Sequence, residues 1–362
     1  MTALAGILAA RIAAQGPISL ADYMADRLLH PLHGYYTTRE PFGAGGDFTT
    51  APEISQMFGE MLGLCLAQAW ADQGRPDLFV LAEIGPGRGT LMADILRTIR
   101  AAPGMREAAR PVLVEASPAL RARQAETLAG QGACWRDTIA GLPDGPLFLV
   151  ANEFFDALPI RQFRRVEGGW SEVQVGLAEG RLAPGLGPVT DYPALSGRLA
   201  DTRPGDVIEC CPAAPAIATE IAHRVAAFGG AAVIVDYGGW HSLGDTLQAV
   251  RAHASADPFA DPGTADLTAH VDFEVLANAF RAAGAGVTAM VPQGVFLERL
   301  GITARAQALA RGLSGAALDA HVAAHRRLTH PDEMGNLFKV IACHPPACPP
   351  PPGFAPLSCP RA

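Results

Sequence analysis

The chain has 362 residues and a formal net charge of −8 at pH 7, with 49% hydrophobic and 18% charged residues. A chain of this length can bury a large core without disulfide bonds. Its 39 glycines and 30 prolines stay below the roughly 25–30% share that is typical of low-complexity sequence. These values exclude a miniprotein and a globally disordered chain. The acidic balance also argues against a general nucleic-acid binder, which needs clustered cationic side chains.

The cysteine content and the length of the apolar runs give an expectation for the cellular compartment. Seven cysteines are too few and too scattered for a secreted disulfide framework. The start, MTALAGILAARIAAQG, lacks the basic region of a signal peptide, and no apolar run reaches the roughly 18 residues of a membrane span. We therefore expect a cytoplasmic protein without membrane insertion. The cysteine and histidine spacing near the C-terminus fits no zinc pattern, so no metal site is expected.

The first part of the chain has mostly helical apolar spacing, from Leu4 to about Trp70. A glycine-rich loop, HGYYTTREPFGAGGDFTTAPE, interrupts these helical patterns. We predict a helical cap with a glycine-rich loop over residues 1–76.

From Leu78 onward the pattern changes to short apolar runs that end in a charge or a glycine: LFVLAEIG, PVLVEAS, PLFLVANE and AAVIVDYG. Such runs, separated by helical stretches, are typical of buried parallel strands joined by crossover helices. The pattern predicts an α/β domain over residues 77–344. Short alternating runs split by glycine turns predict an antiparallel β-meander inserted at about 160–190.

The C-terminal part continues with a helical pattern at 272–283, and two further helical patterns at 295–313 and 318–328 form a helical subregion at about 295–330. A last strand is expected at 337–343. The proline-rich segment 345–362 is expected to be disordered.

A glycine loop follows the first predicted strand. Glu83 ends that strand, and Gly85, Gly87 and Gly89 precede a helical pattern. Glycines at such a turn allow a ligand to approach the backbone, and the helix offers free N–H groups. The GxGxG spacing differs from the GxGxxG of dinucleotide sites, and the acid would repel a pyrophosphate. A cationic ligand without phosphate, S-adenosylmethionine, fits better.

Further acids follow the next strands. Glu115 ends the second strand, where a carboxylate can accept both ribose hydroxyls. Asp137 follows a short strand at 133–136 and is expected near the adenine amino group. The alternative interpretation is that these are solvated strand-end acids and that the glycines only close a turn.

The motifs together resemble the MidA-like methyltransferases, with coverage from about Tyr23 to Ile341. They are HGYYTTREPFGAGGDFTTAPEISQMFGEMLG, EIGPGRGTL, VEASPALRARQ, NEFFDALPIRQF, VDYG, PGTADLTAHVDF and PDEMGNLFKV. The resemblance implies a class I, Rossmann-like S-adenosylmethionine-dependent methyltransferase fold with an N-terminal helical cap. For mitochondrial members it implies an arginine of a respiratory complex I subunit as acceptor. It also makes the segment GDFTTAPEIS part of the cofactor pocket, with Asp47, Phe48 and Thr49 as the predicted contacts.

The fourth strand opens into Asn152 and the segment that follows it. Ligands bind at the carboxyl ends of parallel strands, so Asn152 is expected to contact the cofactor. Methyl transfer mainly requires the acceptor to be held in line. An arginine acceptor arrives charged, and carboxylates match its geometry. Glu153 and Asp156 are therefore the predicted catalytic pair, although Asp156 as a helix cap remains an alternative.

Aromatic and acidic residues elsewhere complete the predicted site. Tyr35, Tyr36 and Phe48 can place ring faces near a sulfonium, or can serve only in packing. Asp236 ends another buried strand and is expected to line the acceptor channel. His270 is interpreted as a structural residue.

Four functions remain open on these grounds. The leading one is a methyltransferase that modifies arginine in a partner protein. A small-molecule methyltransferase and a non-catalytic assembly chaperone that binds the cofactor are alternatives. An NAD-dependent oxidoreductase is disfavoured by the glycine spacing and by the absence of a catalytic Tyr-x-x-x-Lys.

Overall fold

The computed structural model describes residues 2–38 and 49–354, which form two compact units. The first unit comprises residues 1–48, 156–214 and 241–272, and the second comprises 49–155, 215–240 and 273–362. The predicted cap over 1–76 is thus divided, because the helices after Thr49 pack into the second unit. The first unit is assembled from three stretches that are distant in the sequence.

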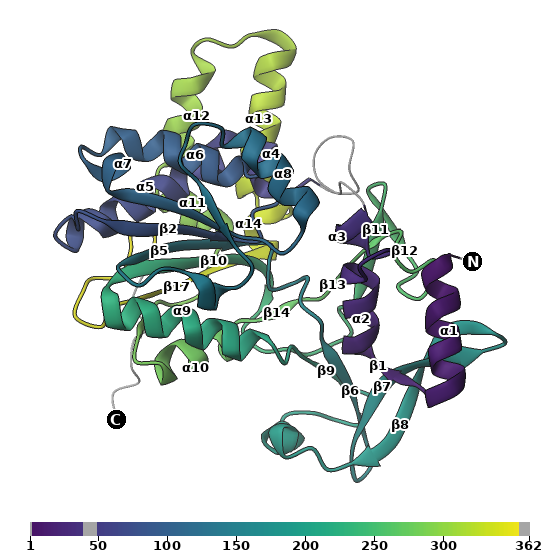
Figure 1. The fold of residues 1–362 in the computed structure, drawn as a ribbon. Coiled ribbons are helices and arrows are strands. Elements are labelled where there is room, and N and C mark those ends of the chain that lie inside the picture. Colours follow the sequence, from purple (N-terminus) through teal and green to yellow (C-terminus); the bar gives the residue numbers. More distant parts are fainter. Residues whose placement is uncertain (1, 39–48, 355–362) are drawn as a thin grey trace. The chain divides into compact units, whose positions relative to one another are not determined.

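The second unit is built on a mostly parallel sheet with the strand order β15-β17-β10-β5-β2-β3-β4 (Figure 1). Neighbours from β10 to β4 run parallel, whereas β17 runs antiparallel to β10. The predicted α/β fold with a mostly parallel sheet is confirmed. The strands are β2 (Phe79–Ile84), β3 (Ala109–Val114), β4 (Cys134–Arg136), β5 (Leu147–Asn152), β10 (Gly230–Gly239), β15 (Gly286–Val287), β16 (Val291–Pro292) and β17 (Phe338–His344).

Helices cover both faces of this sheet, with α5 and α6 on one face and α9 and α10 on the other (Figure 1). Strands β2 and β5 are buried along their whole length, as expected for a sheet covered on both faces. The helices are α4 (Ala51–Ile54), α5 (Gln56–Asp72), α6 (Thr90–Thr98), α7 (Met105–Ala108), α8 (Pro118–Thr127), α9 (Ala214–Phe228), α10 (Phe273–Ala282), α11 (Gln293–Arg299), α12 (Ile302–Ala310), α13 (Gly315–Thr329) and α14 (Met334–Leu337).

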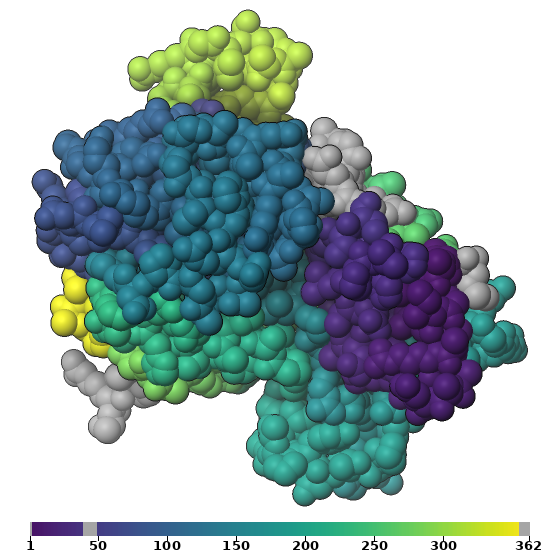
Figure 2. Space-filling model, viewed as in Figure 1, coloured from purple at the N-terminus to yellow at the C-terminus, as the bar shows by residue number. Residues whose placement is uncertain are grey.

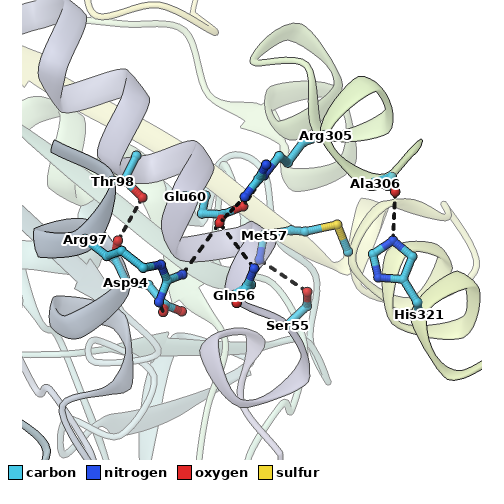
Figure 3. Close-up of polar contacts among 10 residues, drawn as sticks. All are labelled: Ser55, Gln56, Met57, Glu60, Asp94, Arg97, Thr98, Arg305, Ala306 and His321. Carbon is cyan, nitrogen blue, oxygen red and sulfur yellow. Dashed lines mark hydrogen bonds and ion pairs between the residues drawn. The ribbon is translucent and has the colours of Figure 1, made fainter. Parts of the chain in front are cut away.

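Helices α12 and α13 form a hairpin that projects from the second unit (Figure 2). The predicted helical stretch 295–313 is broken at Gly301, which has φ +89°. Arg305 of α12 donates two hydrogen bonds, of 2.7 and 2.8 Å, to the buried carboxylate of Glu60 on α5. Arg97 of α6 lies 3.6 Å from the same carboxylate (Figure 3). This ion-pair group attaches the hairpin to the helices above the sheet.

The beginning of the proline-rich tail is ordered, in contrast to the expected disorder of 345–362. The Phe354 ring packs against Phe296 with centroids 4.8 Å apart. The Cys65 thiol donates to the carbonyl of Pro352. Proline fixes the backbone, so little entropy is lost when a short tail packs on an apolar surface.

The first unit contains an antiparallel sheet with the order β1-β7-β6-β9, in which β8 also pairs with β7. Strands β6, β7 and β8 form the predicted meander, with turns at Gly168 and Gly180. Apolar residues of α1 and α2 pack with those of the sheet in one core. The elements are α1 (Ala3–Gln15), β1 (Ile18–Ser19), α2 (Leu20–Leu29), α3 (Tyr35–Thr38), β6 (Arg161–Val166), β7 (Gly169–Ala178), β8 (Arg181–Thr190), β9 (Val207–Cys210), β11 (Gln248–Arg251), β12 (Ala254–Ala256), β13 (Asp266–Thr268) and β14 (Val271–Asp272).

Within residues 2–38 and 49–354, no helix is both long and apolar enough to cross a lipid bilayer.

Candidate functional site

The glycine loop lies between β2 and α6, at the carboxyl end of the sheet in the second unit. Gly85, Gly87 and Gly89 have φ of +63°, +50° and +81°, a region that other residues rarely adopt. A Cβ added at Gly85 would lie 2.9 Å from the Phe154 ring. Gly89 caps the N-terminus of α6. The loop therefore needs glycine for its conformation, and it brings backbone N–H groups to the sheet edge.

Glu83 lies beneath this loop at the end of β2 and is only 3% exposed. The backbone N–H of Met92 is near the carboxyl and lowers its pKa, an effect smaller than that of burial. The Oε2 atom of Glu83 is buried and has no hydrogen-bond partner among the described residues. Burial raises the Glu83 pKa well above its ordinary value. Without a ligand, Glu83 is thus more easily protonated than a solvated glutamate would be, and a ligand N–H group would supply a partner for Oε2.

Glu115 follows β3, the neighbour of β2, and its carboxylate is held from two sides. Oε1 accepts a hydrogen bond from the backbone N–H of Ser117 at 2.7 Å. Oε2 accepts one from Gln124 Nε2 at 3.3 Å. Burial raises the Glu115 pKa, and these hydrogen bonds oppose that shift. Because β2 and β3 are parallel, Glu115 and the glycine loop lie at the same end of the sheet.

Asp137 follows β4, and its side chain is 84% exposed. It forms an ion pair of 2.6 Å with Arg121 of α8. Arg121 Nε in turn donates to the Glu115 carbonyl at 2.7 Å. Asp137 is therefore placed beside the Glu115 segment, but it already has a cationic partner.

The end of β5 carries two more predicted residues. Asn152 is 7% exposed, and its Nδ2 donates to Glu153 Oε1 at 3.0 Å. The Asn152 Oδ1 atom is buried and has no partner among the described residues. Glu153 has φ +51°, an unusual conformation for a residue other than glycine that often occurs at functional sites. The Ala51 backbone N–H also donates to Glu153 Oε1, at 3.1 Å.

The segment from Thr49 to Ile54 connects these parts of the second unit. Glu53 of α4 accepts a hydrogen bond of 2.6 Å from Thr90, the first residue of α6. Its second oxygen lies 3.5 Å from Arg88 of the glycine loop. Together with the Ala51 contact, these bonds place the segment between the glycine loop and Glu153. Of the three residues that the resemblance assigns to the pocket here, Thr49 is described, whereas Asp47 and Phe48 lie outside the described residues.

Asp236 does not have the open position expected of a residue lining an acceptor channel, because its side chain is fully buried. Oδ2 accepts the backbone N–H groups of Phe154 and Phe155 at 3.2 and 2.9 Å. Oδ1 accepts the N–H of Tyr237 at 3.0 Å. Asp236 thus holds the turn that carries Glu153.

Three predicted residues belong to the first unit. Tyr35 is fully buried in its core and packs edge-to-face on Tyr36 at 5.2 Å, which is a packing environment. Tyr36 donates to Asp266 at 2.8 Å, and burial raises the Tyr36 pKa. Asp156 is 5% exposed, and its carbonyl accepts the N–H of Ala269. No helix begins at Asp156 in the described structure, so it is not a helix cap. Glu153, by contrast, belongs to the second unit.

Two residues of this edge escaped the sequence analysis. Glu53 lies in the segment GDFTTAPEIS, which the resemblance assigns to the pocket, and Gln124 ends the motif VEASPALRARQ, but neither was singled out because neither follows a predicted strand or stands in the glycine loop. Both contact the glycine loop. Within the part of the chain that the structure describes, no cluster of three histidine, cysteine or carboxylate side chains is arranged to hold a metal ion.

Known proteins resemble this chain in sequence and in structure. Residues 61–291 match the family Methyltransf_28, described as "Putative S-adenosyl-L-methionine-dependent methyltransferase". The mitochondrial protein arginine methyltransferase NDUFAF7 of Xenopus laevis is 35% identical, with 95% of this chain and 84% of that protein covered. The human protein of that name is also 35% identical, over 92% and 82% of the two chains.

A crystal structure from Burkholderia thailandensis, bound to S-adenosyl-homocysteine, superimposes with a TM-score of 0.83 at 33% identity. The match covers 94% of this chain and 92% of that one.

These findings correct one expectation from the sequence. The NDUFAF7 relatives are named as mitochondrial proteins, which contradicts the predicted cytoplasmic location. The absence of a recognisable signal peptide was not sufficient to assign a compartment.

The buried oxygens of Glu83 and Asn152, which have no hydrogen-bond partner within residues 2–38 and 49–354, are acceptors suited to a ligand with N–H donors, and the glycine loop brings backbone donors to the same edge. The coenzyme that the sequence predicts, S-adenosylmethionine, has a positively charged amino group and carries no phosphate. From this geometry and the family match, the chain belongs to the S-adenosyl-L-methionine-dependent methyltransferases of the Methyltransf_28 family and uses S-adenosyl-L-methionine as its methyl donor.

Proposed function

We propose that this methyltransferase modifies an arginine side chain of a partner protein, and that the partner is a respiratory complex I subunit. Two of its relatives carry the name protein arginine methyltransferase. The complex I partner follows from the family resemblance of the motifs. The observation that carries the proposal is the placement of Glu153, a carboxylate held in a left-handed turn at the carboxyl end of β5.

In this proposal the glycine loop would hold the cofactor. The buried oxygens of Glu83 and Asn152 would accept N–H groups from its charged amino end. Glu115, which follows the neighbouring strand, accepts the ribose hydroxyls. Thr49 adds a contact from the segment that leads into α4. The contact between Asp137 and the adenine stays a prediction, because Asp137 is paired with Arg121.

The cofactor supplies a methyl group on a positively charged sulfur. In the transfer, one guanidinium nitrogen forms a bond to the methyl carbon while the bond from carbon to sulfur breaks. One proton leaves that nitrogen, so the product remains a cation. Glu153 would bind the guanidinium, orient this nitrogen and attract the departing proton. The hydrogen bonds from Asn152 and Ala51 fix the carboxylate for this role.

The substitution Glu153→Gln tests the role of the charge. The amide keeps the size of the side chain but not its negative charge, so we expect methyl transfer to fall at least tenfold. S-adenosyl-homocysteine binding should change by less than about threefold. The purified enzyme is incubated with tritiated S-adenosylmethionine and complex I subunits, and the labelled protein is hydrolysed to identify methylarginine.

A matched control exists in Glu179, which has φ +50° in the turn between β7 and β8. Glu179→Gln makes the same chemical change in the same backbone conformation and should leave transfer unchanged. Label that enters only a small metabolite would refute a protein acceptor. Tight cofactor binding without any turnover would point to an assembly chaperone instead.

A further inference from the structure

We infer that Gln124 is a positioning residue of the cofactor site, which ties the glycine loop to Glu115 and thereby sets the affinity for the adenosine part of the cofactor. This rests on the proposed contact between Glu115 and the ribose. Gln124 lies on α8 and is completely buried. Neither its residue type nor its position in the sequence marked it as a site residue.

The amide of Gln124 contacts three separate elements of the second unit. Nε2 donates to the carbonyl of Gly87 in the glycine loop at 2.8 Å and to Glu115 Oε2 at 3.3 Å. Oε1 accepts the indole N–H of Trp135, on β4, at 2.8 Å. One side chain thus links the segments that follow β2 and β3 to a residue of β4.

The orientation of this amide follows from the chemistry of its partners. The indole of Trp135 can only donate, whereas a carbonyl and an ionised carboxylate can only accept. The three bonds therefore require two N–H groups on one side of the head group and an oxygen on the other. Glutamine provides this arrangement; glutamate lacks the donors, and methionine lacks both donors and acceptor.

Gln124 also packs against the loop. A Cβ built on Gly89 would lie 3.6 Å from both Cα and Cγ of Gln124, which is ordinary van der Waals distance. The loop is therefore contacted at Gly87 by a hydrogen bond and at Gly89 by packing. Loss of the amide would release the Gly87 carbonyl, and the loop could then shift away from Glu115.

The sequence of α8 explains how Gln124 reaches this position. Ser117 caps the helix, and its backbone N–H holds the other oxygen of Glu115. Seven residues make about two helical turns, so Gln124 returns to the same side of α8 as Ser117. Glu115 is consequently held by two residues of one helix.

The test measures binding of S-adenosyl-homocysteine by calorimetry in the full-length protein. We expect Gln124→Met to weaken binding at least tenfold. Gln124→Glu should weaken it more, because it places a second carboxylate beside Glu115. Unchanged affinity in both variants would overturn the inference. No acceptor is needed, so the result does not depend on whether arginine is the substrate.

Gln73→Met is the matched control. The Gln73 amide also bridges backbone groups, because it donates to the Gly230 carbonyl at 2.8 Å and accepts the Gly230 N–H at 2.7 Å. Gly230 begins β10, so this bridge lies at the opposite end of the strands. The control should lose thermal stability and keep its affinity within about twofold. An equal loss of affinity in the control would show that the effect of Gln124 is general destabilisation.

A double-mutant cycle with Glu115→Gln separates positioning from independent binding. If Gln124 acts through Glu115, the double variant should bind only about as weakly as the weaker single variant. If the fold losses of the two single variants multiply in the double variant, the inference is overturned.

Trp135→Phe is the second variant, for the case that the Gln124 variants fail to fold. Trp135 is only partly buried, and its exchange removes the indole N–H that fixes the orientation of the Gln124 amide. It should weaken binding about threefold, and an unchanged affinity would count against the inference.

Discussion

The two ends of the sheet in the second unit differ in whether their buried polar groups have hydrogen-bond partners. At the carboxyl end, Glu83 and Asn152 bury oxygens that have no partner among the described residues. At the amino end, Gln73 forms two hydrogen bonds with Gly230, whose position leaves no room for a side chain. A buried polar atom without a partner reduces stability by about 1–3 kcal/mol. The difference indicates that the carboxyl end is shaped for a ligand and the amino end for stability.

An alanine substitution at one glycine of the amino end should mainly lower stability, whereas one at the carboxyl end should mainly lower affinity for the cofactor. At Gly230, with φ +106°, a Cβ would lie 1.9 Å from the Leu147 carbonyl oxygen. Backbone cannot easily move away, so Gly230→Ala should reduce stability by about 3–5 kcal/mol. The folded fraction should bind S-adenosyl-homocysteine normally.

Gly85→Ala, at the carboxyl end, is the counterpart. The added Cβ meets the ring of Phe154, which can rotate, so the loss of stability should be about 1–2 kcal/mol. The glycine loop would shift, and we expect affinity to fall at least thirtyfold. Urea unfolding and calorimetry on both variants measure the two effects. The comparison of the two ends fails if Gly230→Ala weakens binding as strongly as Gly85→Ala does.

The pH dependence of cofactor binding, measured in the wild type and in Glu83→Gln, tests whether the carboxyl end of the sheet is shaped for a ligand. Burial raises the Glu83 pKa, so the unbound enzyme carries a proton there at pH values where an ordinary glutamate is ionised. A cationic ligand group favours the carboxylate, and binding then releases this proton. Affinity for S-adenosyl-homocysteine should therefore rise with pH, above the pH at which an ordinary glutamate ionises, until the raised pKa of Glu83 in the unbound enzyme is passed. The amide introduced by the substitution cannot titrate, so the variant should show no such rise in calorimetry at several pH values.

Asp94 offers the smallest effect, because it is a buried acid on α6 that already has a cationic partner. Burial raises its pKa to about 6, and Arg97, at 2.7 Å, opposes the shift. From pH 4 to 6 the folded state binds more protons than the unfolded state, so this part of the stability decreases as pH rises. Asp94→Asn should remove about 1 kcal/mol of this pH-dependent decrease in the free energy of unfolding, measured by urea unfolding between pH 4 and 6. Cofactor affinity should stay unchanged, in contrast to Glu83.

The sequence was sufficient for features that depend on neighbours along the chain. Continuous apolar runs identified β2, β3, β5 and β10, because strands covered on both faces are apolar throughout. The glycine loop was found because three glycines at one turn have few other uses. The meander was found because alternation and glycine turns are local.

Features that depend on distant segments could not be predicted. The hydrogen bond from Tyr36 to Asp266 joins residues 230 positions apart, and such pairs define the first unit. The sequence marks Asp236 as a strand-end acid, but not that its carboxylate turns back onto the N–H groups of Phe154 and Phe155. Gln124 was missed because a buried glutamine has no sequence signature.

The hydrogen bonds from the Phe154 and Phe155 amides to Asp236 bear on how this turn could be engineered. The backbone of this turn is held at Phe154 by a residue 82 positions away. Residue 153 can therefore be exchanged, even for glycine or asparagine, which tolerate its positive φ, while the turn keeps its form. Because Glu153 is the proposed acceptor-binding residue, exchanges at this one position would test its part in acceptor choice on a turn whose backbone is held from elsewhere.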